Sequence, residues 1–150
     1  MAALGARFLA VDWGTTNRRV FVIEDGAVVH TERDPKGVTA VAPGGFADEA
    51  AAIRARHGDL PMLLAGMVGS NIGWRTAPYV PAPAGVAELA AALSWIDART
   101  AIVPGLSTER DGRPDVMRGE EVQLLGAVAA GMAPPDALLA QPGTHCKWAE

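Results

Sequence analysis

The sequence is poor in cysteine, in basic charge and in long hydrophobic runs. One cysteine in 150 residues, Cys146, cannot form an intrachain disulfide, which suits a reducing cytoplasm. A net charge of −4 argues against a nucleic-acid surface. No apolar stretch approaches the ~20 residues that a membrane-spanning helix needs. With 49% hydrophobic and 20% charged residues, the composition is that of a globular protein, and we expect it in the cytoplasm.

Common ligand-binding motifs are also missing. No G-x-x-x-x-G-K-[ST] occurs, which excludes a P-loop, and the glycines of residues 66–74 do not have the dinucleotide-binding spacing. Cys146 follows His145, but there is neither a C-x-x-C nor a histidine pair at metal-ligand spacing. A Cys/His metal site or nucleophile is therefore rejected.

What the sequence does contain is a polar turn between two short apolar runs, which predicts a β-hairpin. Gly14 permits close approach of a ligand to the backbone, and Thr15 and Thr16 can surround phosphate oxygens together with the turn amides. Arg18 can add charge-assisted hydrogen bonds, and Asp12 at the strand end can hold hydrated Mg²⁺ or orient a hydroxyl. An ordinary hairpin with a polar tip is the alternative, but these residue types rarely occur together by accident.

The segments after this hairpin indicate the fold class. Residues 27–33 read as a third, antiparallel strand, residues 46–57 have helical spacing, and residues 62–65 form a short buried strand. Three antiparallel strands, a helix and a further strand are typical of an α/β domain of the ribonuclease-H-like kind. We expect a mixed sheet, antiparallel in its first three strands and then parallel, flanked by helices.

The middle of the chain is less regular. The glycine-rich residues 66–74 follow a strand directly, where open α/β sheets usually bind ligands, although taken alone they are better explained as a plain crossover loop. Residues 77–83 contain three prolines and should be extended without regular structure. The later expectations are an amphipathic helix over residues 86–96, a buried strand over 100–103 and a polar loop over 104–114.

Two neighbouring carboxylates open a predicted helix over residues 119–131. Glu120 and Glu121 are explained either by the positive end of the helix dipole or by one of them facing a cleft as a base. Residues 137–148 then repeat the strand, Gly-Thr turn and strand of the N-terminus. We therefore expect two domains of like topology that face each other across a cleft, with residues 1–133 in the first and 134–150 beginning the second.

Several motifs carry a resemblance to a known family. In chain order they are VDWGTTNRR, GMVGSNIGW, APYVPAP, VPGLS, PDVMRGEEVQLLGA and PGTHCKW. Together they resemble the 2-dehydro-3-deoxygalactonokinase family, within the sugar-kinase, heat-shock-70 and actin superfamily. The resemblance implies a two-domain actin-like ATPase fold and transfer of the γ-phosphoryl group of ATP to the 6-hydroxyl of 2-dehydro-3-deoxy-D-galactonate, in bacterial galactonate breakdown.

The resemblance also implies roles for individual residues. The first phosphate loop would comprise Asp12, which also positions Mg²⁺ through water, with Gly14, Thr15, Thr16, Asn17 and Arg18. The second would comprise Gly143 and Thr144, with Lys147 as a charge partner.

The acceptor side of the site is implied in the same way. Gly119-Glu120-Glu121 occupies the place of a Gly-Asp-Gln motif in related kinases, so Glu120 is the candidate base, with Glu121 as its competitor near the substrate. Arg118 would hold the substrate carboxylate, and Met67, Ser70 and Trp74 would be substrate neighbours.

Alternatives to this function remain open. Another carbohydrate kinase, or a phosphate-chain hydrolase on the same scaffold, would use a similar Asp-Gly-Thr-Thr turn. The chain stops soon after the second phosphate turn, so we also expect the isolated 150 residues to lack kinase activity. The expected partners are ATP and a small sugar acid, with neither nucleic acid nor membrane.

Overall fold

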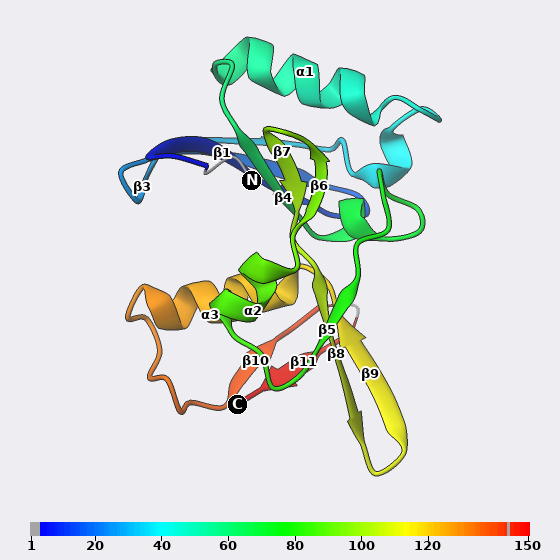
Figure 1. The fold of residues 1–150 in the computed structure, drawn as a ribbon, viewed down its shortest axis with the longest axis vertical. Coiled ribbons are helices and arrows are strands. Elements are labelled where there is room, and N and C mark those ends of the chain that lie inside the picture. The colour runs from blue at the N-terminus through cyan, green and yellow to red at the C-terminus, as the bar shows by residue number, and fades with distance from the viewer. Residues whose placement is uncertain (1–3, 144) are drawn as a thin grey trace.

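The computed structural model describes residues 4–143 and 145–150 and shows two lobes. The sheet lobe, at the top of Figure 1, contains a six-stranded sheet with helix α1 on one side. The small lobe, below it, contains helices α2 and α3, the three-stranded sheet β5-β8-β9 and the two-stranded sheet β10-β11.

The elements follow one another from the N-terminus to the C-terminus. They are β1 (Arg7–Trp13), β2 (Arg18–Glu24), β3 (Ala27–Asp34), the 3₁₀ turn η1 (Val38–Ala40), α1 (Phe46–His57), β4 (Met62–Ala65), the 3₁₀ turn η2 (Met67–Gly69), β5 (Tyr79–Pro81), α2 (Val86–Ala91), β6 (Ser94–Asp97), β7 (Thr100–Ile102), β8 (Gly105–Arg110), β9 (Arg113–Met117), α3 (Glu120–Ala129), β10 (Leu139–Gln141) and β11 (Lys147–Ala149).

The large sheet is mixed, as the sequence predicts. Its strand order is β3-β2-β1-β4-β7-β6. The first three strands pair in antiparallel fashion, β1, β4 and β7 run parallel, and β6 is antiparallel to β7. The predicted helix over residues 46–57 and strand over 62–65 are confirmed with the same bounds.

Alternating burial explains why the first strands form. Leu9, Val11 and Trp13 of β1 are buried, and Val20 and Val22 of β2 lie beside them on the same face. Helix α1 covers this face, and each buried aliphatic side chain contributes about 1.5–3 kcal/mol. The indole of Trp13 is buried and donates from Nε1 to the carbonyl of Lys36 at 2.9 Å.

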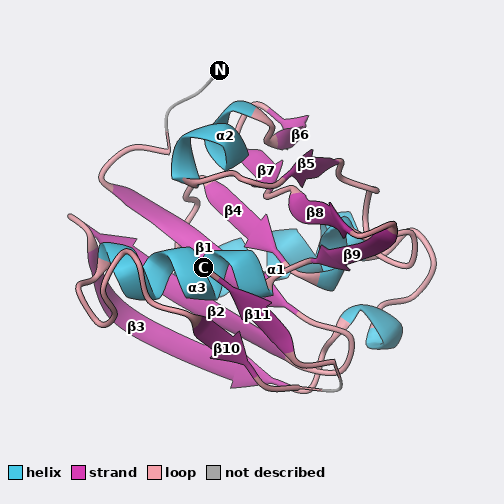
Figure 2. Ribbon diagram, turned by 90° about the horizontal axis from the view of Figure 1, so that it is seen from below, coloured by secondary structure: helices cyan, strands magenta, loops and turns pink. Residues whose placement is uncertain are grey.

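The other face of the sheet joins the two lobes. Ala65 at the end of β4, Leu89 of α2 and Val103 form a second buried cluster, against which Leu106 and Leu125 pack. Figure 2 shows α3 and the β10-β11 pair on this side. The carboxyl ends of β1 and β4 therefore point toward the small lobe.

Three expectations for the middle of the chain are wrong. Residues 86–96 are not one helix: α2 ends at Ala91, and Ser94–Asp97 pairs with β7 as an edge strand, where Trp95 and Ile96 have high β-propensity. Residues 104–114 are not a loop but most of the hairpin β8-β9. Its turn is Asp111-Gly112, with φ of 54° and 72°, a strong hairpin signal within a polar stretch.

The proline-rich residues 77–83 also contain regular structure. Tyr79–Pro81 forms strand β5, which pairs in parallel with β8 at the edge of the three-stranded sheet. An edge position tolerates proline because the missing amide does not interrupt a ladder on that side.

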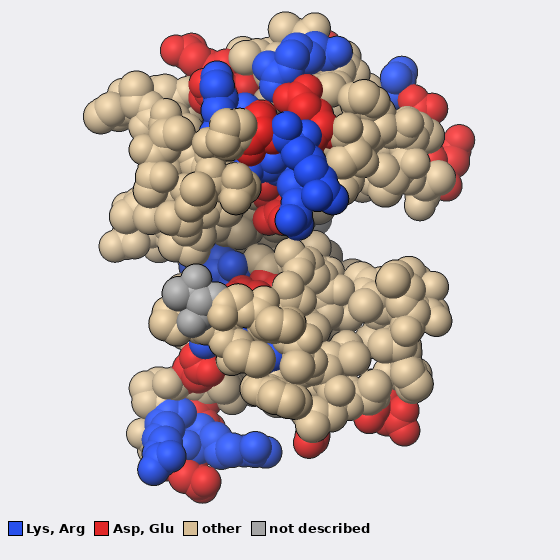
Figure 3. Space-filling model, turned by 180° about the vertical axis from the view of Figure 1, so that it is seen from behind, with Lys and Arg blue, Asp and Glu red and all other residues tan. Residues whose placement is uncertain are grey.

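Two further features are the distribution of charge on the surface and the length of the helices. On the face opposite to that of Figure 1, acidic and basic side chains are interspersed over the sheet lobe (Figure 3). Among the described residues, no helix is both long and apolar enough to cross a bilayer.

Candidate functional site

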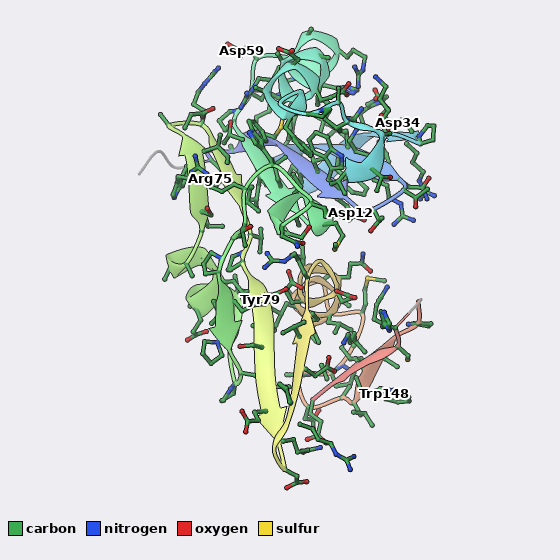
Figure 4. The ribbon with its side chains drawn as sticks, turned by 90° about the vertical axis from the view of Figure 1, so that its right-hand side faces the viewer. Asp12, Asp34, Asp59, Arg75, Tyr79 and Trp148 are labelled. Carbon is green, nitrogen blue, oxygen red and sulfur yellow. The ribbon has the colours of Figure 1, made fainter. Side chains whose placement is uncertain are left out.

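The candidate site lies where the carboxyl ends of β1 and β4 meet the start of α3. Asp12 is the penultimate residue of β1 and pairs in register with Ala65 at the end of β4. In Figure 4, Asp12 lies at the rim of the sheet lobe that faces the small lobe. Its side chain is 33% exposed, so it is accessible to a ligand.

Two glycines allow these three segments to come together. Gly66 and Gly119 have φ of 95° and 105°, a region that side chains rarely adopt. A Cβ at Gly66 would lie 2.9 Å from the carbonyl oxygen of Trp13, and a Cβ at Gly119 would lie 3.1 Å from the Cα of Gly66. Larger residues would push the start of α3 away from the sheet.

The close approach places Glu120 within electrostatic reach of Asp12. Burial raises the pKa of the Asp12 carboxyl above its ordinary value, the Arg19 guanidinium opposes this, and the Glu120 charge raises the pKa further. Glu120 accepts a hydrogen bond from the backbone amide of Arg118 at 2.9 Å through Oε2. Two carboxylates thus converge at the end of the sheet.

The polar turn after β1 is held in place by residues 37–39. Its carbonyls of Gly14, Thr15 and Thr16 accept hydrogen bonds from the amides of residues 37–39, at 2.9, 3.3 and 3.0 Å respectively. In a trans peptide, the carbonyl of one residue and the N–H of the next point in opposite directions. The N–H groups of Thr15, Thr16 and Asn17 therefore face away from residues 37–39, and no described residue accepts a hydrogen bond from them. Such a row of amides is an anion-binding nest.

Arg18 does not reach this nest, which corrects its expected phosphate-binding role. Its side chain is 1% exposed and is paired with the carboxylates of Asp34 and Glu49. The guanidinium carbon lies 4.8 Å from the centre of the Trp13 ring. Strand alternation explains the placement, because Arg18 lies on the same face of β2 as the buried Val20.

Arg19 is the residue that the sequence reasoning missed. It pairs with Asp12 across the hairpin, and its Nη1 lies 3.6 Å from Asp12 Oδ2 with 45% of the side chain exposed. The same alternation that buries Arg18 turns Arg19 toward the site. The buried positions of β2 were therefore a sufficient signal to choose between the two arginines.

Two of the residues expected near the substrate, Arg118 and Glu121, lie at the lobe junction. Arg118 is partly buried, donates from Nη2 to the carbonyl of Ala77 at 2.8 Å and lies over the Tyr79 ring at 4.3 Å. Its Nε and Nη1 have no hydrogen-bond partner among the described residues.

Glu121 is buried, with 1% of its surface exposed. Its Oε2 accepts from the amide of Gly119 at 2.7 Å, and its Oε1 has no hydrogen-bond partner among the described residues. Burial raises the pKa of Glu121 to about 7. Glu121 thus presents no exposed carboxylate to a ligand, whereas the substrate contact expected for Arg118 stays a prediction.

The glycine-rich loop holds the remaining expected substrate neighbours. Ser70 is 8% exposed, and its hydroxyl donates to the carbonyl of Met67 at 2.6 Å, so it braces the loop internally. Met67 is partly buried against the core. Trp74 stacks on Phe46 with ring centres 6.3 Å apart and lines a groove between residues 38–44 and 71–74.

The second turn lies in the small lobe. Gly143 is exposed, and Thr144 lies outside the described residues. Lys147 is paired with Asp115 of β9 through Nζ at 2.5 Å. No hydrogen bond or ion pair links the described part of this turn to residues 12–19.

Among residues 4–143 and 145–150, no group of three His, Cys, Asp or Glu side chains could hold an ion. The single carboxylate of Asp12, one-third exposed, suits a hydrated Mg²⁺ whose other ligands are waters and phosphate oxygens.

The fold and this arrangement define an α/β protein with a candidate phosphate site at the carboxyl ends of its strands. The chain belongs to the 2-keto-3-deoxy-galactonokinase family, whose model matches residues 12–150.

Individual relatives agree with this membership. The chain is 38% identical over 147 residues to the 2-dehydro-3-deoxygalactonokinase of Escherichia coli K12, covering 97% of the chain and 49% of that protein. It is 43% identical over 148 residues to a Rhizobium meliloti protein assigned as 2-dehydro-3-deoxygalactonokinase DgoK1, covering 94% of the chain and 48% of the relative.

A solved structure is also similar. A Sinorhizobium meliloti protein assigned as a 2-dehydro-3-deoxygalactonokinase superposes with a TM-score of 0.83 at 41% identity, over 94% of this chain and 49% of that one. The chain thus spans about half the length of the relatives it matches.

Proposed function

We propose that this chain forms the N-terminal portion of an enzyme that transfers the γ-phosphoryl group of ATP to the 6-hydroxyl of 2-dehydro-3-deoxy-D-galactonate. The observation that carries the proposal is the convergence of Asp12, Glu120 and three outward-facing amides at one end of the sheet. The names of the E. coli and R. meliloti relatives supply the acceptor.

The finer description of the fold belongs to the same proposal. The strand order, with three antiparallel strands followed by parallel β4 and β7, supports a ribonuclease-H-like domain at residues 1–133. The β10-β11 pair supports a second such domain beginning at residue 134, because two strands alone are marginally stable. Together they would form an actin-like ATPase fold with the site between the domains.

Each accessible residue then has a role in the chemistry. Phosphoryl transfer depends mainly on positioning and on neutralising negative charge. The amides of residues 15–17 and the exposed Arg19 would bind phosphate oxygens, joined from the second domain by Gly143, Thr144 and Lys147. Glu120 would orient the acceptor hydroxyl and take its proton.

Two further assignments concern the metal and the acceptor. Asp12 would hold Mg²⁺ through water, and the ion would neutralise charge on the phosphate chain. Met67 and Trp74 are the remaining candidates for contact with the sugar acid. Arg118, only partly buried, stays the candidate for the substrate carboxylate, whereas Arg18, Ser70 and Glu121 are buried and are not assigned ligand contacts.

The test is an assay on the protein expressed from its complete reading frame, called here the complete protein. ADP formation is measured with and without 2-dehydro-3-deoxy-D-galactonate, and the position of the new phosphoryl group is read by ³¹P NMR. We expect acceptor-dependent ADP and a 6-phosphorylated product. Phosphate release that is independent of the acceptor would reject the kinase in favour of a phosphate-chain hydrolase.

A parallel assay measures kinase activity and ATP binding of the 150-residue chain alone. We expect no kinase activity and weak ATP binding, because the amides of the first turn would bind only one side of the phosphate chain. Tight ATP binding by this chain in calorimetry would contradict that expectation. A cytoplasmic location stays part of the proposal.

A further inference from the structure

The side chain of Arg18 is buried among charged groups from three segments. Nε and Nη2 donate to Asp34 Oδ2 at 3.2 and 2.9 Å, and Nη1 donates to Glu49 Oε2 at 2.9 Å. Asp34 ends β3 and Glu49 is in the first turn of α1. A buried guanidinium is tolerated only when it is paired, and here each of its nitrogens is.

The same cluster holds the backbone of Lys36. Asp34 Oδ1 accepts a hydrogen bond from the backbone amide of Lys36 at 2.8 Å. The backbone carbonyl of Lys36 accepts one from Trp13 Nε1 at 2.9 Å. The backbone N–H and carbonyl of Lys36 are therefore both held by side chains that surround Arg18. Residues 36–39, called here the backing segment, begin at this anchored point.

The backing segment in turn holds the first phosphate turn. Gly37 packs so closely that a Cβ there would lie 2.2 Å from the carbonyl oxygen of Thr15. Thr39 adds its hydroxyl to the backbone contacts already described, donating to the same carbonyl at 2.9 Å. Since these contacts orient the peptide planes, they also determine where the N–H groups of residues 15–17 point.

We propose that Arg18 is a positioning residue that preorganises the anion nest of residues 15–17 through the backing segment. The inference rests on the proposed function for the identity of the ligand, a phosphate chain. Arg18 does not contact that ligand. It fixes Asp34, which anchors Lys36, and the backing segment then turns three amides outward before the ligand arrives.

The first test replaces Arg18 in the complete protein by methionine, which keeps the length of the side chain. We expect R18M to lower kcat/KM for ATP by roughly 10²-fold, the scale of a displaced binding group. KM for the acceptor should change less than twofold, because the acceptor does not touch the nest. The matched control is R56M: Arg56 of α1 pairs with Glu32 of β3 at 2.7 Å, so it also links α1 to β3 but does not contact the backing segment.

A binding measurement makes the test independent of catalysis. Tripolyphosphate is titrated against the complete protein while the amide resonances of residues 15–17 are followed by NMR. We expect these resonances to shift in the wild type and in R56M, and the affinity to fall at least tenfold in R18M. Equal affinity in R18M and the wild type, or equal losses in R18M and R56M, would overturn the positioning role. Absence of any shift in the wild type would overturn it as well.

A milder pair of variants covers the case in which R18M fails to fold. T39V removes one exposed hydroxyl that donates to the Thr15 carbonyl, and T31V removes an exposed hydroxyl of β3 far from the turn. We expect severalfold weaker tripolyphosphate binding in T39V only, in line with one lost hydrogen bond. Wild-type binding by T39V would contradict the inference. If tripolyphosphate binds as expected but no acceptor is phosphorylated, the proposed function fails and the positioning role stands.

Discussion

Arg19 Nη1 lies 3.6 Å from Asp12 Oδ2, and the two residues face each other directly across the β1-β2 ladder. At this distance the contact is an ion pair without a good hydrogen bond. Both side chains are partly exposed, and pairs of this kind are worth about 0–1 kcal/mol. Breaking this ion pair therefore costs little, as the proposed contacts of Arg19 with a phosphate oxygen and of Asp12 with a hydrated cation require.

Replacing Arg19 by glutamine should affect both ATP use and the pH profile. In the complete protein we expect R19Q to raise KM for ATP. Because the Arg19 charge lowers the pKa of Asp12, its removal should raise that pKa further and move the acid limb of kcat/KM to higher pH. R7Q is the control, since Arg7 pairs with Glu24 at the opposite end of the same hairpin. A pH profile and KM identical to those of the wild type would show that Arg19 has no part in the site.

Glu120 is expected to act on the acceptor rather than on ATP. In the complete protein, E120Q should lower kcat by at least ~10²-fold, the lower range for a general base, and leave KM for ATP nearly unchanged. E109Q, at the exposed end of strand β8, is a control of the same chemistry outside the site. Unchanged turnover in E120Q would reject its assignment as the base and direct attention to another carboxylate.

The sequence predicts the sheet lobe well because its signals are local. Alternating apolar residues indicate β1 and β2, and helical spacing followed by Gly58 delimits α1. The elements after β4 are predicted poorly because short strands form only where a partner strand is present. Ser94–Asp97, at the edge of the large sheet, becomes a strand only beside β7, and β5 of the small lobe only beside β8.

The candidate site likewise contains residues that local sequence signals predict and residues that they do not. The turn at residues 14–17 and the acidic start of α3 are visible in the sequence, since residue type and position suffice. Which of Arg18 and Arg19 lies beside Asp12 depends on which face of β2 is buried. Residue type alone does not show this, and it led to the prediction of Arg18 instead of Arg19. The burial of Glu121 depends on Gly66 and Gly119 meeting between the lobes, a contact that no local pattern contains.

Glu121 should make stability depend on pH. Burial, the main cause, raises its pKa from 4.5 to about 7, so the folded protein holds this proton more tightly than the unfolded chain does. The contribution is fully present below about pH 4.5 and is lost as the pH rises through about 7, on the order of 3 kcal/mol in total. Urea unfolding of the wild type at about pH 5 and about pH 8 should show this decrease, and E121Q should lack that part of it. An equal pH dependence in E121Q would rule out Glu121 as its source.

The contact between Gly119 and Gly66 should be sensitive to a single methyl group. G119A places a Cβ 3.1 Å from the Cα of Gly66 at a φ of 105°, so we expect a loss of about 1–3 kcal/mol in the free energy of unfolding. We also expect kcat to fall, because the start of α3 carries Glu120 away from Asp12. The matched control is G126A in the same helix, where a Cβ meets nothing within 4 Å and alanine should stabilise the helix by about 0.5–1 kcal/mol. If G119A were as stable and as active as G126A, the two glycines would not be what brings the carboxylates together.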